Sequence, residues 1–167
     1  MNHTEHRTTA PKSTRCYVVT VSDTRTDDND HGGAAIVALL KQQGHEIVGK
    51  IIIPDDPTQI RTILLQQISS SEVDAVITTG GTGISKRDGT YEVVSVLLDK
   101  QIDGFGEFFR SLSFEEIGPS AMLSRACAGI SRGKIIISVP GSEHAVRLAM
   151  TRLVLPELGH LVREARR

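Results

Sequence analysis

The sequence of 167 residues has no tryptophan, two tyrosines and four phenylalanines, so aromatic side chains cannot make up its core. Isoleucine, valine and leucine must form the core instead, and a hydrophobic content of 39% is enough for one aliphatic core. No apolar run approaches the roughly 20 residues that a membrane-spanning helix needs. The sequence therefore predicts one globular domain rather than a membrane protein.

An excess of charge is also absent, because 19 basic and 20 acidic residues give a net charge of −1. This balance gives no reason to expect nucleic acid or a membrane surface as a partner, although a local basic pocket is compatible with it. The first 14 residues are polar and lack the apolar segment of a secretory signal. We expect a cytoplasmic protein with a flexible tail over residues 1–14 and a single domain over residues 15–167.

Cysteine is scarce too. Cys16 and Cys127 lie far apart, and neither belongs to a Cys-x-x-Cys unit, which argues against a metal or redox site. We expect both thiols to be buried and reduced, as free cysteines usually are. The six histidines show no ligand spacing, so surface or supporting positions are expected for them rather than metal ligation.

Apolar, β-branched runs alternate with amphipathic segments along the chain. The runs predicted as strands are Cys16–Val21, Glu46–Ile53, Val73–Thr79 and Lys134–Val139. The segments predicted as helices are Ala34–Gln43, Pro57–Ser69, Tyr91–Lys100, most of 104–131, and the chain from Glu143 onward, kinked or split by Pro156. Continuous apolar strands that alternate with helices predict an α/β domain with a parallel sheet covered on both faces.

Two helix starts carry recognisable capping residues. Asp56 precedes Pro57 and is followed three positions later by Gln59, which predicts an N-cap with proline at the first helical position. Thr90 is the predicted cap of the helix that begins at Tyr91. Asp55 is left without such a local role and is the better functional candidate of its pair, with a solvated loop carboxylate as the alternative.

Polar residues and glycines follow the four predicted strands. They are Ser22-Asp23, Pro54-Asp55-Asp56, Gly80–Gly83 with Arg87-Asp88, and Pro140-Gly141-Ser142. Ligands of open α/β sheets bind beyond the carboxyl ends of the strands. The sequence therefore predicts a site built there from amides, hydroxyls and carboxylates.

The turn Gly80-Gly81-Thr82-Gly83 is the strongest local signal, because glycine lets the backbone approach a ligand and leaves amides facing an anion. It is neither a Walker A loop nor a G-x-G-x-x-G motif, and a tight strand-to-helix connection is the alternative. Arg87 suits phosphate and Asp88 suits magnesium. A surface salt bridge or a local turn supported by Asp88 would explain that pair equally.

These segments together resemble the family of molybdenum cofactor biosynthesis protein B and molybdopterin adenylyltransferase, which includes the gephyrin G-type domains. The resemblance covers about residues 16–155, and Leu112–Gly118 is more similar to the protein B branch. The motifs that carry it are Val21-Ser22-Asp23-Thr24, Thr79-Gly80-Gly81-Thr82-Gly83, Arg87-Asp88, Thr90, Glu92, Gly104-Phe105-Gly106-Glu107, Met122-Leu123-Ser124-Arg125 and Val139-Pro140-Gly141-Ser142.

The resemblance implies a three-layer α/β/α sandwich with a mostly parallel central sheet, assembled as a homotrimer or homohexamer. It implies molybdopterin and ATP as substrates, magnesium as cofactor, and other proteins of the molybdenum cofactor pathway as partners. Asp55 and Asp88 match the two acidic positions that adenylylation requires, and would position magnesium and nucleotide. The binding residues that it implies are Ser22, Gly80, Gly81, Thr82, Gly83, Ser113, Pro140, Gly141 and Ser142.

This sequence differs from particular members of the family at two places that bear on adenylyltransferase activity. Some protein B members lack the acidic residue at the position of Asp88, and its presence here favours an adenylyltransferase. Gly141-Ser142-Glu143 stands where catalytic relatives resemble Gly-Asn-Pro, which favours a pterin-binding or assembly protein without catalysis. An unrelated nucleotide-binding regulator is a third reading, because fold alone does not fix function.

Overall fold

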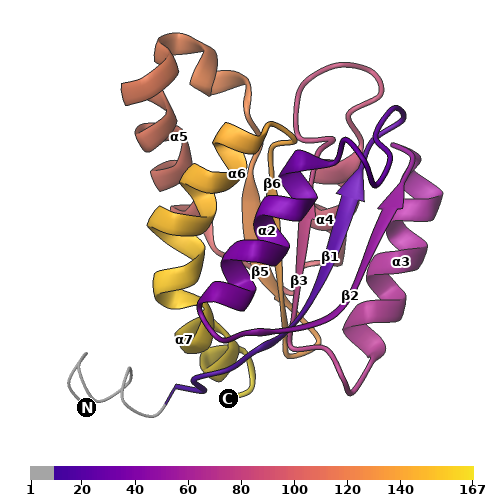
Figure 1. The fold of residues 1–167 in the computed structure, drawn as a ribbon, viewed down its shortest axis with the longest axis vertical. Coiled ribbons are helices and arrows are strands. Elements are labelled where there is room, and N and C mark those ends of the chain that lie inside the picture. Colours follow the sequence, from indigo (N-terminus) through magenta and orange to yellow (C-terminus); the bar gives the residue numbers. More distant parts are fainter. Residues whose placement is uncertain (1–9) are drawn as a thin grey trace.

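The computed structural model describes residues 10–167, which form one six-stranded sheet between two layers of helices (Figure 1). The strand order is β2-β1-β3-β6-β5-β4. The strands are β1 (Arg15–Val21), β2 (Glu46–Ile53), β3 (Ala75–Thr79), β4 (Lys100–Gln101), β5 (Cys127–Ser131) and β6 (Lys134–Val139). The first four in spatial order are parallel, whereas β5 pairs antiparallel with both β6 and β4. The predicted α/β fold with a mostly parallel sheet is confirmed.

Each face of the sheet has its own helical cover (Figure 1). One face packs against α2 (His31–Gln42), α5 (Asp103–Ile117), α6 (Glu143–Ala149) and α7 (Leu155–Ala165). The other packs against α3 (Pro57–Ser69) and α4 (Thr90–Leu97). Because side chains alternate along a strand, Ile135 and Ile137 enter the first layer and Ile136 the second. The core is aliphatic as predicted, and both cysteines are buried within it.

Two of the helices predicted from the sequence extend further along the chain than the helices in the structure. The segment Tyr91–Lys100 was predicted as one helix, but α4 ends at Leu97 and Lys100 lies in β4. The predicted helical region 104–131 is helical only to Leu123, through α5 and a 3₁₀ segment over Gly118–Leu123, and then forms β5. The prediction is wrong there because the β5 sequence CAGIS is poor in β-branched residues, so its extended form depends on pairing with β6.

The capping predictions had mixed outcomes. Asp56 accepts a hydrogen bond from the Gln59 N–H at 2.9 Å, as predicted for the start of α3. Thr90 does not cap α4, because Gly89 occupies that position and Thr90 is buried inside the helix start. The α2 helix begins at His31, earlier than predicted, because Asp30 caps it by accepting from the Gly33 N–H at 2.9 Å.

The sequence predicts that Pro156 kinks or splits the C-terminal helix, and the structure has an irregular segment just before this residue. A π-helical segment over Met150–Val154 separates α6 from α7, and Pro156 lies in the first turn of α7. Proline suits that position because its missing N–H would have no helical partner there. A widened turn before it is one way in which a helix accommodates such a residue.

The predicted tail of residues 1–14 is only partly within the described residues, since residues 1–9 lie outside them. Thr14 is buried, and its N–H and hydroxyl lie 3.2 Å and 2.8 Å from Nδ1 of His45. The carbonyl of Pro11 lies so close to Gly159 of α7 that a methyl group added there would approach it to 2.5 Å. Within residues 10–167, no helix is long and apolar enough to span a membrane.

Candidate functional site at the carboxyl end of the sheet

The strand order places a switch point between β1 and β3. From β1 the chain first adds β2 on one side and then adds β3 on the other, so the carboxyl ends of β1 and β3 border the crevice that α/β proteins use for ligands. Gly80 makes this junction possible, because it has φ +99° and an added methyl group would lie 2.1 Å from the Val21 carbonyl oxygen. Only glycine permits so close an approach.

Asp55 and Asp88 both lie beside the same glycine turn. A methyl group added at Gly81 would lie 2.8 Å from Oδ2 of Asp55. A methyl group added at Gly83 would lie 2.7 Å from Oδ2 of Asp88. The two carboxylates thus converge on the turn although they are far apart in the chain, and Thr82 between the two glycines is buried.

Asp55 is a buried acid that forms no salt bridge within residues 10–167, although the positive charge of Arg87 acts on it and offsets in part the rise in its pKa that burial causes. Its side chain is 7% exposed, and Oδ1 accepts a hydrogen bond from the Gly89 N–H at 3.1 Å. Burial raises the pKa of Asp55, and the negative charges of Asp88 and Asp23 raise it further. A cation placed beside it would relieve this repulsion.

Asp23 organises the loops on either side of Asp55. Its Oδ1 accepts from the Asp55 N–H at 3.0 Å and from Nη2 of Arg87 at 2.7 Å, and its Oδ2 accepts from Nε of Arg87 at 3.0 Å. The surface salt bridge considered for Arg87 is therefore present. The local turn considered for Asp88 is present as well, because Oδ2 of Asp88 accepts from the Ser85 N–H at 2.8 Å.

Arg125 holds the loop from the opposite side. Its Nε donates to the Gly83 carbonyl at 2.9 Å and its Nη2 to the Asp88 carbonyl at 3.1 Å. Sequence reasoning assigned no role to Asp23 or Arg125. The only available signal was their presence in the motifs Val21–Thr24 and Met122–Arg125, which gave no indication of what they contact.

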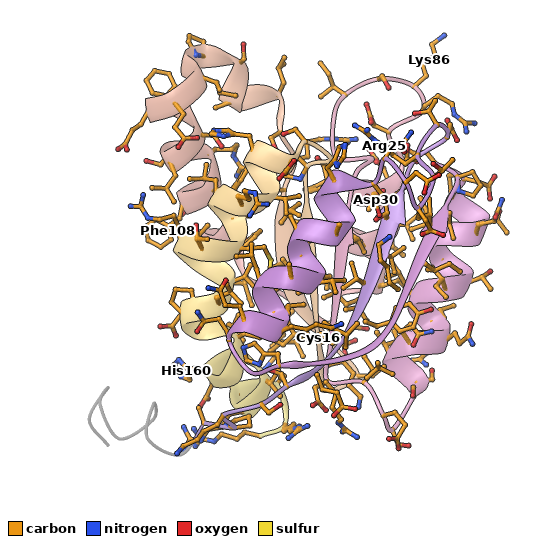
Figure 2. The ribbon with its side chains drawn as sticks, viewed as in Figure 1. Cys16, Arg25, Asp30, Lys86, Phe108 and His160 are labelled. Carbon is orange, nitrogen blue, oxygen red and sulfur yellow. The ribbon has the colours of Figure 1, made fainter. Side chains whose placement is uncertain are left out.

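A cavity of about 330 Å³ opens beside the glycine turn, at the ends of β1, β3 and β6. Its lining residues are Thr20, Val21, Ser22, Thr24, Arg25, Asp30, Thr79, Gly141 and Ser142. Figure 2 shows Arg25 and Asp30 at this end of the sheet, with Lys86 at the tip of the neighbouring loop. The structure thus brings Ser22, Gly141 and Ser142 together at one hollow.

Several of these polar groups already have structural partners. The Ser142 hydroxyl caps α6 by accepting from the Ala145 N–H at 3.2 Å. The Ser22 hydroxyl accepts from the N–H groups of Thr24 and Arg25, each at 3.2 Å. The carbonyl of Pro140 accepts from the Thr79 hydroxyl at 2.8 Å. These contacts fix the walls of the cavity.

Ser113 does not line this cavity. It is buried on the inner face of α5, one turn before the end of that helix. Glu116 on the same turn contacts His144 of α6 at 2.6 Å, so the end of α5 lies beside the start of α6. Ser113 is therefore the predicted binding residue of α5 that the structure leaves out of the cavity wall.

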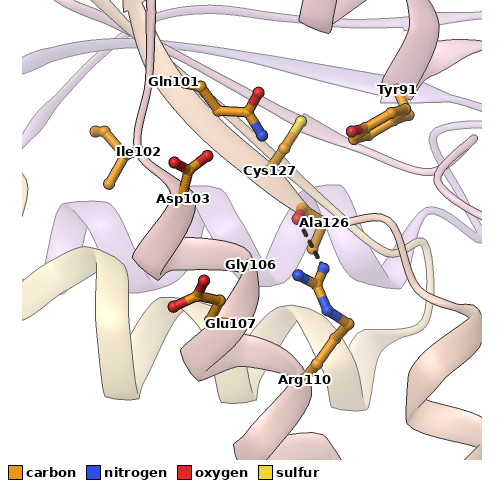
Figure 3. A pocket seen from close by; sticks show the side chains of 9 residues that line it. All are labelled: Tyr91, Gln101, Ile102, Asp103, Gly106, Glu107, Arg110, Ala126 and Cys127. Carbon is orange, nitrogen blue, oxygen red and sulfur yellow. Dashed lines mark hydrogen bonds between the residues drawn. The ribbon is translucent and has the colours of Figure 1, made fainter.

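A second, smaller hollow of about 180 Å³ lies between α5 and the start of β5 (Figure 3). Asp103, Glu107 and Arg110 from α5 face Cys127 and Tyr91 across it. Burial raises the pKa of Cys127 to about 11, so the thiol stays protonated near neutral pH.

The acids at the glycine turn fit magnesium only if other ligands complete the site. Within the described part of the chain, no three histidine, cysteine or acidic side chains group so that they could hold a metal by themselves. Magnesium commonly binds through one or two carboxylates together with substrate phosphates and water. Asp55 and Asp88 beside a glycine turn are a donor set of that kind.

Comparisons with known proteins agree on one family. Residues 17–160 match the family model described as "Probable molybdopterin binding domain". The chain is 52% identical over 168 residues to molybdenum cofactor biosynthesis protein B of Bacillus cereus, covering 100% of this chain and 99% of that protein.

Solved structures of the same kind superpose closely on this fold. The crystal structure of a molybdenum cofactor biosynthesis protein B has a TM-score of 0.90 at 52% identity, covering 93% of this chain and 98% of that chain. The tungsten cofactor synthesizing protein MoaB from Pyrococcus furiosus has a TM-score of 0.84 at 38% identity, covering 95% and 100%.

Proposed function

The chain belongs to the molybdopterin-binding family of molybdenum cofactor biosynthesis protein B, and we propose that it adenylylates molybdopterin with ATP and magnesium. Membership assigns it to molybdenum cofactor biosynthesis and to binding of the pterin. The observation that supports the transfer step is the convergence of Asp55 and Asp88 on the glycine turn. Such a pair, next to amides at a switch point, suits two phosphate groups and a cation.

The proposed reaction joins two anions. An oxygen of the pterin's terminal phosphate attacks the α-phosphorus of ATP, a new P–O bond forms, and the bond to the departing pyrophosphate breaks. The chain has to align these groups and offset their mutual repulsion. The turn Gly80–Gly83 offers backbone amides, and the N-terminus of α4 directs its dipole at the same region.

Asp55 and Asp88 would hold the magnesium ion, which supplies the charge neutralisation that phosphoryl transfer needs. The raised pKa of Asp55 supports this assignment, because a buried carboxylate with two acidic neighbours gains most from a bound cation. Ser22, Gly141 and Ser142 line the adjoining cavity and would face the pterin side.

The direct test is a turnover assay. Purified protein given molybdopterin, ATP and magnesium should release adenylylated pterin and pyrophosphate. We expect Asp88→Asn to bind pterin with unchanged affinity and to lose turnover by about 10²–10³-fold, as when one transition-state contact is removed. Asp56→Ser is the matched control, because serine keeps the cap of α3 and Asp56 has no assigned role in transfer. Unchanged turnover in Asp88→Asn would contradict the proposal.

A second candidate is a pterin-binding protein that does not catalyse transfer. It is favoured by Gly141-Ser142-Glu143, where Ser142 serves as a helix cap, and by the internal contacts that already engage Arg87 and Asp88. Tight binding of molybdopterin without product, even after long incubation with Mg-ATP, would establish this alternative.

We also propose a homotrimer or homohexamer, as family resemblance implies. Large apolar side chains are exposed on α5 and the 3₁₀ segment after it, and Figure 2 shows Phe108 pointing outward from α5. They are Phe108, Phe114, Ile117, Met122 and Leu123. Exposed apolar surface of this kind commonly marks a protein interface. Light scattering should report three or six copies, and Phe108→Glu, at a side chain that is 66% exposed, should reduce that number. A wild-type monomer at micromolar concentration would refute the assembly.

A further inference from the structure

We infer that Arg125 is a positioning residue, which sets the distance between Asp55 and Asp88 by orienting the peptide bond that follows Asp88. The effect of Arg125 on turnover rests on the proposed function. The effect of Arg125 on the structure of the loop does not, because its contacts with the loop lie within the protein itself.

Arg125 ties together the two ends of one loop. Nε donates to the carbonyl of Gly83, where the loop begins, and Nη2 donates to the carbonyl of Asp88, where it ends. The backbone N–H of Arg125 also donates to the carbonyl of Thr82 at 3.0 Å. Residues 84–87 between these anchor points are exposed, and they are held by the pair of Arg87 with Asp23 and by the turn between Ser85 and Asp88. Arg125 is the side chain that joins the two ends of the loop to each other.

The peptide bond between Asp88 and Gly89 connects Arg125 with Asp55. Its carbonyl accepts from Nη2 of Arg125 at 3.1 Å, and its N–H donates to Oδ1 of Asp55 at 3.1 Å. Both hydrogen bonds exist only in one orientation of this peptide plane. Hydrogen bonds in such a chain polarise and strengthen one another. Arg125 therefore acts on Asp55 through the peptide and on Asp88 through the loop.

The guanidinium group of Arg125 is itself held in place by α4. Glu92 accepts hydrogen bonds from Nη1 and Nη2, and the hydrogen bond from Arg125 lowers the pKa of Glu92. The ring centroid of Tyr91 lies 4.9 Å from Cζ, within the range of a cation–π contact. The carboxylate and the ring fix the plane of the fork, which decides where its N–H groups point.

Lysine could not replace this arrangement. Arginine presents five N–H donors in a rigid planar fork, whereas lysine carries one compact ammonium group on a flexible stem. A lysine at position 125 would keep the positive charge but could not reach Gly83, Asp88 and Glu92 at once. Arg125→Lys thus separates the geometry from the charge.

The first experiment is hydrogen exchange on ligand-free protein. We expect the amides of residues 83–89, that of Gly89 above all, to exchange about tenfold faster or more in Arg125→Lys, as the loss of one or two hydrogen bonds predicts. Arg132→Lys is the matched control, since within residues 10–167 the side chain of Arg132 donates to the Ser69 hydroxyl and makes no contact with this loop. Unchanged exchange over residues 83–89 in Arg125→Lys would overturn the inference.

The second experiment tests the route through Asp88. Arg125→Lys should lower kcat by about tenfold or more while KM for molybdopterin changes little, because neither Arg125 nor the two acids line the cavity assigned to the pterin. Adding Arg125→Lys to Asp88→Asn should cost less than the loss in Arg125→Lys alone, because only the route through Asp55 then remains. Fully multiplicative losses would show that Arg125 does not act through Asp88. A wild-type protein that makes no product would refute the proposed function, and the exchange result would still decide the inference.

Discussion

Two buried aspartates at opposite ends of the sheet are treated differently by their surroundings. Asp74 at the amino end is 5% exposed, and Asp55 at the carboxyl end is 7% exposed. Asp74 pairs with the side chain of Arg15 at 2.8 Å, accepts the Arg15 N–H at 2.9 Å and also pairs with Arg166. Burial would raise the pKa of Asp74, but these partners outweigh it and the pKa is lowered. The pKa of Asp55 moves the other way.

The difference separates a carboxylate with cationic partners from one that the proposed function assigns to a bound cation. Asp74 joins the start of β1 to the end of the chain beyond α7, and its cationic partners stabilise the fold. For Asp55, burial and the charges of its two acidic neighbours outweigh the Gly89 hydrogen bond and the charge of Arg87, so its pKa is raised and its ionised form is disfavoured. Perturbed acids of this kind concentrate at functional sites because function, not stability, retains them.

Removing Asp74 should give the largest effect on stability. We expect Asp74→Ala to lower the free energy of unfolding by about 3 kcal/mol, because it leaves two arginines facing a buried gap. Urea denaturation at pH 7 measures this change. Glu72→Ala is the control, since Glu72 is 72% exposed and meets Arg15 only at 3.6 Å. A loss no larger than that of the control would break the comparison.

The stabilisation by Asp74 should also depend on pH. Its pKa is lower in the folded protein than the value of about 3.9 in an unfolded chain, so its contribution is complete above that value. The contribution is then lost as the pH falls through the folded pKa. Between pH 5 and pH 3 the wild type should lose more stability than Asp74→Asn, and parallel curves would contradict the assignment.

Filling the glycine turn should come next in size. Gly81 has φ +66°, and an added methyl group would approach the Thr90 hydroxyl to 2.2 Å. We expect Gly81→Ala to cost about 2 kcal/mol from strain and crowding combined. Gly44 has φ +81°, and a methyl group added there would have no neighbouring atom within 4 Å. Gly44→Ala therefore reports the cost of the backbone strain alone. Equal losses in denaturation of both variants would show that close packing at the turn is unimportant.

Neutralising Asp55 should stabilise the protein, whereas removing the carboxylate of Asp74 should destabilise it. We expect Asp55→Asn to raise the free energy of unfolding at pH 7 by about 1 kcal/mol, since the amide oxygen still accepts from the Gly89 N–H while the repulsion disappears. In the wild type the folded pKa is raised, so stability falls as the pH rises from about 4 until Asp55 ionises in the fold. Thermal melting of both proteins without magnesium, from pH 4 to pH 7, measures both effects. A less stable Asp55→Asn would contradict this account.

The smallest effect should come from His45, which lies near the amino end. Burial lowers the pKa of His45, and its Nδ1 accepts from the Thr14 N–H. Below about pH 6.5 the unfolded chain therefore binds the proton first, and stability falls by less than about 1 kcal/mol toward pH 5.5. His45→Asn can place an oxygen where Nδ1 accepts and should remove this pH dependence. Chemical denaturation at pH 7.5 and 5.5 measures the change in the free energy of unfolding. The same change in the wild type and in His45→Asn would contradict the role given to His45.

Elements whose signals are local follow from the sequence alone. Glu46–Ile53, Pro57–Ser69 and Lys134–Val139 form as predicted, because apolar periodicity and the Asp56-Pro57 cap act within a few residues. The glycine turn was likewise visible in the sequence, whereas the pairing of Asp55 with Asp88 was implied only by the family resemblance. Local patterns of this kind need no knowledge of the rest of the chain.

Tertiary structure decided what depends on contacts between distant segments. The strand β5 exists because β6 lies beside it, and a single sequence window does not reveal this pairing. The salt bridge from Arg87 to Asp23 spans 64 positions, and the hydrogen bond from Arg125 to Gly83 spans 42. Such bonds form only after the fold has brought their partners together, which is why the residues that hold the two acids in place could not be assigned from the sequence.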